Sequence, residues 1–83
     1  MNDLQKKQIL YRSIHRGCKE TDFLIGEFAK ENLENFDLEQ LNLFAQFIVE
    51  DDLLIYDWLL EKADSPKKYE ELLRVMRGFH KMT

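Results

Sequence analysis

The sequence predicts an all-α fold, a compact bundle of five short helices. Apolar residues recur at helical spacing in five segments, and residues typical of helix starts and stops separate these segments. No segment has the alternating pattern of a β-strand, and no internal repeat or low-complexity stretch interrupts the chain. We expect one helical domain over residues 1–83, which can form a core without a disulfide or a metal ion.

The first predicted helix covers residues 3–16 and ends at Gly17, a residue type that suits the position after a helix C-terminus. Charges at both ends complement the helix dipole. Its apolar residues are spaced to share one face, which we expect to point inward: Leu4, Tyr11 and Ile14, with Ile9 and Leu10 beside them.

The second predicted helix begins at Lys19 or Thr21 and ends at Lys30. Gly26 lies inside it and costs about 1 kcal/mol relative to alanine, so we expect another helix to approach closely there. Residues 31–36 are expected to form a loop or a fraying turn. Two i, i+4 pairs should face inward, Leu24 with Phe28 and Ile25 with Ala29.

The third predicted helix has the clearest start, because Asp37 can cap it and Gln40 completes a capping-box pattern. Its apolar residues match the full helical template, so we expect it to be the central helix of the bundle. These residues are Leu41, Phe44, Ala45 and Ile48, with Leu38, Phe47 and Val49 widening the apolar face.

The fourth predicted helix starts after Glu50, with Asp51 or Asp52 as its cap, and ends near Ala63. It carries Leu54, Ile55, Trp58 and Leu59. We expect the pair formed by Trp58 and Tyr56 to be core rather than a ligand platform.

The fifth predicted helix opens with Ser65 as cap and Pro66 at the first helical position, and Gly78 begins a frayed tail. Its apolar stripe is typical of a helix with one buried face. The stripe contains Tyr69, Leu72, Leu73, Met76 and Phe79 or His80.

The formal net charge of −4 argues against nucleic acid as a partner, because phosphate backbones are bound by lysine and arginine. The cations gather near both ends of the chain, which favours an oriented contact with another protein. Cys18 is the single cysteine, so we expect a reducing compartment. We expect neither a signal peptide nor membrane insertion, and therefore a location in the bacterial cytoplasm, or in the mitochondrial matrix after removal of a presequence.

Residues with the chemistry of an active site are sparse. The only histidines, His15 and His80, lie far apart in sequence, so we expect no metal site. His15 precedes Cys18 by three residues, but Gly17 interrupts the helix between them, so a thiol enzyme is weakly supported. The three glycines are isolated, so no phosphate-binding loop is predicted. The residues alone indicate a helical interaction module without catalytic residues.

The stretch from Leu10 to Asp22 is the strongest candidate for a recognition surface. Arg16 and Glu20 flank Gly17, where a partner's backbone could approach closely because glycine has no side chain. The same residues also suit ordinary helix punctuation, with a cation at a helix end and carboxylates at the next helix start. Both interpretations stay open at this point.

Two elements of the chain resemble the succinate dehydrogenase flavinylation factor family. The first is Arg-Gly-x-x-Glu, here Arg16, Gly17 and Glu20, preceded by Tyr11-Arg12-Ser13. The second is an acidic pair, Asp51-Asp52, followed by the segment 56–59 with the pattern Tyr-x-Trp-Leu. The chain departs from the family at Leu53-Leu54, where a more polar stretch is usual, and at Thr21, where an apolar residue is usual.

The resemblance implies a small helical assembly factor that is not an enzyme. Such a factor binds the flavoprotein subunit of succinate dehydrogenase, in bacteria also that of fumarate reductase, and promotes covalent attachment of FAD to a histidine of that subunit. We expect it to be a monomer that holds no tightly bound cofactor and acts on the FAD of its client. The partner-binding residues implied are Arg12, Arg16, Gly17, Glu20, Asp22 and Asp52.

Two other interpretations remain open. One is a different helical interaction module, such as an antitoxin or a regulator of another protein, which capture of a non-flavoprotein partner would reveal. The other is a small enzyme that uses Cys18 and His15, which would require a thiol pKa well below the free value of about 8.5.

Overall fold

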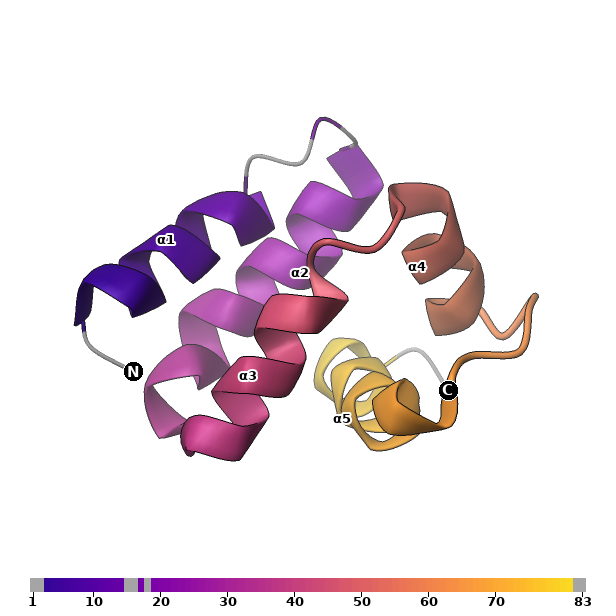
Figure 1. Ribbon diagram of the computed structural model, residues 1–83. Helices are drawn as coiled ribbons and strands as arrows, with labels where there is room; N and C mark the ends of the chain where they lie inside the picture. Colours follow the sequence, from indigo (N-terminus) through magenta and orange to yellow (C-terminus); the bar gives the residue numbers. More distant parts are fainter. Residues whose placement is uncertain (1–2, 15–16, 18, 82–83) are drawn as a thin grey trace.

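The computed structural model describes residues 3–14, 17 and 19–81. This part of the chain forms five α-helices and two short 3₁₀ turns and contains no strand, so the predicted all-α class is confirmed (Figure 1). The elements are α1 (Asp3–Ile14), α2 (Lys19–Asn32), η1 (Leu33–Asn35), α3 (Leu38–Phe47), α4 (Asp52–Leu59), η2 (Lys67–Tyr69) and α5 (Glu70–His80).

Helix α2 occupies the centre, with α1 on one side and α4 and α5 on the other (Figure 1). The prediction that the third helix would be central is therefore wrong. Helix α3 keeps one long polar face in solvent, whereas α2 contacts helices on two sides. Ile25, Phe28 and Ala29 of α2 are completely buried, as the i, i+4 pairing predicted.

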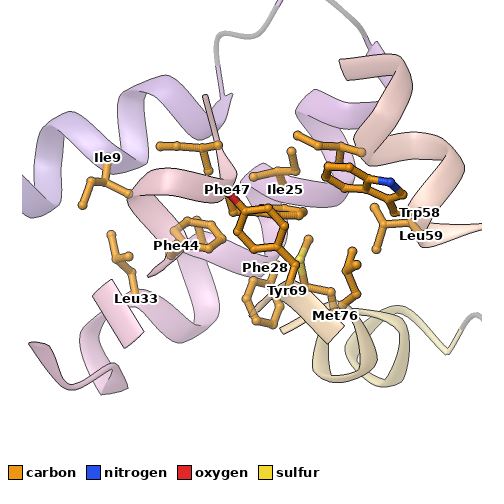
Figure 2. Packing of buried hydrophobic residues seen from close by; sticks show 14 of the residues in the cluster. Ile9, Ile25, Phe28, Leu33, Phe44, Phe47, Trp58, Leu59, Tyr69 and Met76 are labelled. Atoms are coloured by element: carbon orange, nitrogen blue, oxygen red, sulfur yellow. The ribbon is translucent and has the colours of Figure 1, made fainter. Parts of the chain in front are cut away.

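The core is rich in aromatic rings drawn from four elements (Figure 2). The ring of Phe47 meets that of Tyr69 edge-on, with 5.2 Å between centroids, and also packs against Trp58 at 6.4 Å. Phe28 and Phe44 extend this cluster, with centroids 6.1 Å apart. Aromatic pairs of this kind add about 0.5–1.5 kcal/mol beyond area burial, which matters in a domain with so few residues.

The predicted helix starts at Asp37 and Asp51 are confirmed. Asp37 accepts a hydrogen bond from the Gln40 backbone N–H at 2.8 Å, and the Gln40 side chain accepts one from the Asp37 backbone at 2.9 Å, which completes the capping box. Asp51, not Asp52, caps α4, because its carboxylate accepts from the N–H of Leu53 at 3.0 Å.

Several predicted helix boundaries differ from the structure. Helix α4 ends at Leu59 rather than near Ala63, helix α2 continues to Asn32, and α5 continues through Gly78 to His80. Ser65 does not cap α5, because the 3₁₀ turn η2 precedes that helix and no side chain caps either element. At the end of α5, His80 contacts the carbonyl oxygen of Leu24 in α2, a tertiary contact that no local signal in the sequence encodes.

The predicted apolar face of α1 is wrong in two of its residues. The side chains of Leu4 and Tyr11 are more than half exposed, whereas Ile9 and Ser13 are buried against α2. The Ser13 hydroxyl donates to the Ile9 carbonyl at 2.8 Å, which satisfies it inside the contact. Leu38 at the start of α3, Val49 in the turn after α3, and Leu54 of α4 are likewise exposed instead of inward.

The close contact expected at Gly26 is confirmed. A Cβ atom added there would lie 3.3 Å from Cγ1 of Ile14 and 3.6 Å from the carbonyl oxygen of Ser13. The absence of a side chain lets α1 and α2 cross closely at this level. This close contact fixes the position of the end of α1, and therefore of the turn that leads from α1 into α2.

Candidate functional site

The turn between α1 and α2 is exposed, and its backbone is unusual at Gly17. Gly17 has a φ of +89°, a left-handed conformation that L-residues rarely adopt. No atom of the described residues lies within 4 Å of the position a Cβ would take, so the outer side of the turn is open. The geometry therefore fits both helix punctuation and an approachable surface. Arg16, with His15 and Cys18, lies outside the described residues.

The predicted carboxylates Glu20 and Asp22 lie in the first turn of α2. Glu20 is exposed and Asp22 is half-buried. Carboxylates at this end complement the positive pole of the helix dipole, so they stabilise α2 whether or not they bind a partner. Arg12 is exposed in the last turn of α1, next to the same turn in the chain.

Asp52 lies in the first turn of α4, where it is half-buried. Helix α4 packs against α2, and the two helices begin at the same end of the molecule (Figure 1). The fold thus brings the acidic start of α4 to the end of the molecule that carries Gly17 and Glu20. The structure does not test whether these residues bind a partner, so the site remains a prediction.

The second sequence element, in contrast, belongs to the core. Trp58 and Leu59 are buried, and Figure 2 shows both side chains pointing into the cluster. Arg77 of α5 donates to the carbonyl of Leu59 at 3.0 Å and to that of Trp58 at 2.6 Å. These bonds satisfy the C-terminal carbonyls of α4, so this element supports the site instead of forming its surface.

Two further contacts hold α5 and η2 against the rest of the molecule. The Nε2 atom of His80 lies 2.7 Å from the carbonyl oxygen of Leu24, which joins the end of α5 to α2. The Tyr69 hydroxyl donates to a carboxylate oxygen of Glu50 at 2.8 Å. Burial, and secondarily the hydrogen bond to Glu50 and its charge, raises the pKa of Tyr69 to about 12.

The exposure of Leu53 and Val49, two apolar residues close to Asp52 in the chain, was not predicted from the sequence. Leu53 and Val49 are 73% and 69% exposed, the largest values among the large apolar residues that the structure describes. Their only signal in the sequence was Leu53-Leu54 in a stretch where a more polar one was expected. They give the acidic end of α4 an apolar border.

Chemical groups that could support other functions are scarce in the described residues. Across residues 3–14, 17 and 19–81, no three histidine, cysteine or acidic side chains gather closely enough to hold a metal ion. Among the helices of this part of the chain, none has both the length and the hydropathy of a membrane-spanning segment.

Known proteins with similar sequences point to one family. Residues 7–80 match the family described as "Flavinator of succinate dehydrogenase". The chain is 37% identical over 78 residues to succinate dehydrogenase assembly factor 2-B, mitochondrial, of Drosophila ananassae, which covers 90% of this chain and 48% of that protein. It is 34% identical over 73 residues to succinate dehydrogenase assembly factor 2, mitochondrial, of Dictyostelium discoideum, which covers 87% of this chain and 52% of that protein.

The chain therefore spans about half the length of the curated relatives that it matches. No solved structure matches it significantly. The family match nevertheless runs from α1 to α5 and includes both the Gly17 turn and the buried Trp58 element. The chain belongs to the family of flavinators of succinate dehydrogenase.

Proposed function

We propose that this protein is an assembly factor that binds the flavoprotein subunit of succinate dehydrogenase, and that of fumarate reductase where present, and promotes covalent attachment of FAD. Family membership supports the client and the reaction. The observation that carries the site is the open, left-handed Gly17 turn beside Glu20, at the end of the molecule where α4 also begins. Arg12, Arg16, Asp22 and Asp52 complete the proposed contact surface.

The protein would act by positioning its client and not by catalysing the bond itself. The attachment chemistry belongs to the flavin and to a histidine of the client. A rigid helical surface can favour the client conformation in which histidine and isoalloxazine ring are aligned, which lowers the entropic part of the barrier. Arg16 and Glu20 would supply charged hydrogen bonds, and Gly17 would permit close approach.

In this proposal the protein works as a monomer without a tightly bound cofactor. The rigid core around Phe47, Trp58 and Tyr69 suits that role, because it holds the α2 and α4 ends in fixed relation. The compartment would be the one in which the client acquires its flavin: the bacterial cytoplasm, or the mitochondrial matrix. The names of the relatives describe those proteins as mitochondrial.

The test is co-expression with a succinate dehydrogenase flavoprotein subunit in a host that lacks its own factor. The client is denatured and separated on a gel, and flavin fluorescence is read at its band. We expect fluorescence that depends on this protein and is lost with Gly17→Arg, because a long side chain would occupy the open side of the turn.

Gly17→Asn is the matched control, because asparagine tolerates the left-handed conformation better than other residues with a side chain. This variant adds a small side chain with little backbone strain, whereas Gly17→Arg adds a long one. Flavin fluorescence at the client band should therefore be higher with Gly17→Asn than with Gly17→Arg. An intact client that is flavinylated equally well without this protein would refute the proposed function.

A further inference from the structure

A cleft of about 370 Å³ opens between α1 and the end of α2, away from the Gly17 turn. Helices α1 and α2 run antiparallel and cross closely at Ile14 and Gly26 (Figure 1). About two helical turns back from that crossing, Lys6 of α1 faces η1, and the space between the helices is no longer filled. The cleft is thus a consequence of where the close crossing is placed.

The floor of the cleft is apolar. Ala29 and Leu33 are buried, and Leu10 is half-buried against the same core. Figure 2 shows Ile9 and Leu33 at the border of the core near this region. The volume lies at the lower end of the range for ligand pockets and suits one large apolar side chain with its backbone better than a whole cofactor.

The rim of the cleft is cationic although the chain is acidic. Lys6, Lys7 and Lys30 line it together with the carboxylate of Glu34, and Lys30 also pairs with Glu27. The ion pairs at the rim are long, with 3.7 Å between Lys6 and Glu34 and 3.6 Å between Lys30 and Glu27. The carboxylate of each pair is accessible to solvent, and solvent-accessible ion pairs of this length contribute little, so an incoming carboxylate can replace it at small cost.

We propose that this cleft is a second docking site for the flavoprotein client, and that it takes an acidic segment of the client which places one apolar side chain on the floor. The proposal deepens the proposed function and rests on it. Charge complementarity selects the occupant, because three ammonium groups around an apolar floor match a peptide that combines carboxylates with an apolar residue. The same complementarity disfavours a nucleic acid, which the acidic remainder of the surface would repel.

Two separated contacts would also explain how a small protein can orient a large client. The Gly17 turn joins α1 to α2 at one end of the helix pair (Figure 1), and the residues that line the cleft lie toward the other end of the two helices. One contact leaves the client free to rotate, whereas two contacts on one rigid body fix its orientation. The cleft would therefore contribute affinity and orientation without touching the reacting atoms.

The first experiment measures the dissociation constant of the purified flavoprotein subunit for this protein and for Lys7→Glu/Lys30→Glu. We expect binding to weaken at least about tenfold, and its dependence on salt between 50 and 500 mM to become shallower, because long-range attraction to the acidic segment is lost. The matched control is Lys62→Glu/Lys67→Glu, which makes the same change of charge at exposed lysines between α4 and α5. Equal weakening by both pairs would overturn the proposal.

A second experiment identifies the occupant directly. In a Cys18→Ser background, Lys30→Cys carries a photo-reactive crosslinker, and Lys67→Cys serves as control. We expect Lys30→Cys to crosslink to one acidic client segment that contains an apolar residue, and Lys67→Cys not to label that segment. Crosslinks to a basic segment, or to a second copy of this protein, would overturn the proposal.

The two proposals fail in different ways. If the parent protein binds no flavoprotein subunit, both the proposed function and the cleft proposal fall. If the parent protein binds and Gly17→Arg abolishes flavinylation, while the Lys7→Glu/Lys30→Glu variant behaves like its control, only the cleft proposal falls.

Discussion

The Gly17 turn and the Trp58 element are the two regions that carry the family resemblance, and they lie in opposite environments. Gly17 is exposed with open space beside it, whereas Trp58 is buried between Phe47 and Tyr69. The family signature thus contains one exposed motif, which can contact a partner, and one buried motif, which stabilises the fold that presents it. The comparison teaches that a motif residue can serve function in two ways: by contacting a partner directly, or by stabilising the residues that make that contact. In this protein the burial of the side chain distinguishes the two roles.

The difference predicts that variants of the two regions will separate stability from client flavinylation. Changes in the Trp58 region should lower the free energy of unfolding first and affect the client only through the loss of folded protein. Changes at the Gly17 turn should affect the client while the fold persists. The following predictions run from the largest expected change in stability to the smallest.

Trp58→Ala should destabilise the fold by about 3–5 kcal/mol, because it leaves a cavity beside Phe47 and Tyr69. Urea unfolding followed by far-UV circular dichroism measures the change. For a domain of this size the loss is a large fraction of the total stability, so we expect a partly unfolded protein at 37 °C. A folded and stable Trp58→Ala that no longer supports flavinylation would contradict the structural role.

Alkaline pH should weaken the same region through Tyr69, whose pKa is raised from 10.0 to about 12. Because the folded-state pKa is the higher one, the protonated side chain stabilises the fold below about pH 10, and this stabilisation is lost as the pH rises toward 12. The raised pKa corresponds to about 2–3 kcal/mol. Unfolding free energies measured at several pH values should therefore fall more steeply for the parent protein than for Tyr69→Phe; parallel curves would refute the assignment.

Arg77→Met should cost about 1–3 kcal/mol, since it keeps the apolar stem but removes the side-chain donor to the carbonyls of Leu59 and Trp58, of which Trp58 keeps the Glu61 backbone N–H. Arg74→Met is the control, because Arg74 is exposed and donates to Glu71 of its own helix. Thermal unfolding of the two variants should differ clearly. Equal melting temperatures would show that the carbonyl caps of α4 contribute nothing measurable.

Gly17→Ala should have the smallest effect on stability, about 1–2 kcal/mol, which is the cost of forcing a residue with a Cβ into the left-handed conformation. Its effect on client flavin fluorescence should nevertheless exceed that of Arg77→Met when folded protein is held equal. If flavinylation instead follows melting temperature across all four variants, the proposed division between surface and support is wrong.

Local chemistry in the sequence was sufficient to predict most helix starts and the reason for two glycines. Asp37 with Gln40, and Asp51, cap the helices because a cap needs only the backbone of the next turn. Both glycines were also predicted from their local context. Gly17 suits the position after a helix end, and Gly26 is unfavourable inside a helix unless another helix approaches closely there. The site prediction was equally local, because Gly17, Glu20 and Asp22 are close in sequence.

The assignment of inward and outward faces depended on partners that the sequence does not reveal. Leu4 is as apolar as Ile9, and Tyr11 has a large apolar ring, but α2 crosses α1 along Ile9 and Ser13. Ile9 and Ser13 are therefore buried, whereas Leu4 and Tyr11 are exposed. The central position of α2 follows from its contacts with three other helices, which no single segment can encode. Helix periodicity defines a face, whereas the neighbours decide how much of it is covered.

By itself the sequence determined the helical class, the capping box at Asp37 and the two constrained glycines, because each depends on residues that are neighbours in the chain, and two short motifs indicated the family. The tertiary structure alone decided that Arg77 of α5 bonds to the carbonyls of Trp58 and Leu59, and that α4 begins at the same end of the molecule as the Gly17 turn. It also decided that Lys7 and Lys30, which lie on different helices, share the rim of one cleft. The physical reason is that burial and charge clustering depend on how helices that are distant in the sequence pack against one another, and this packing is determined only in the folded structure.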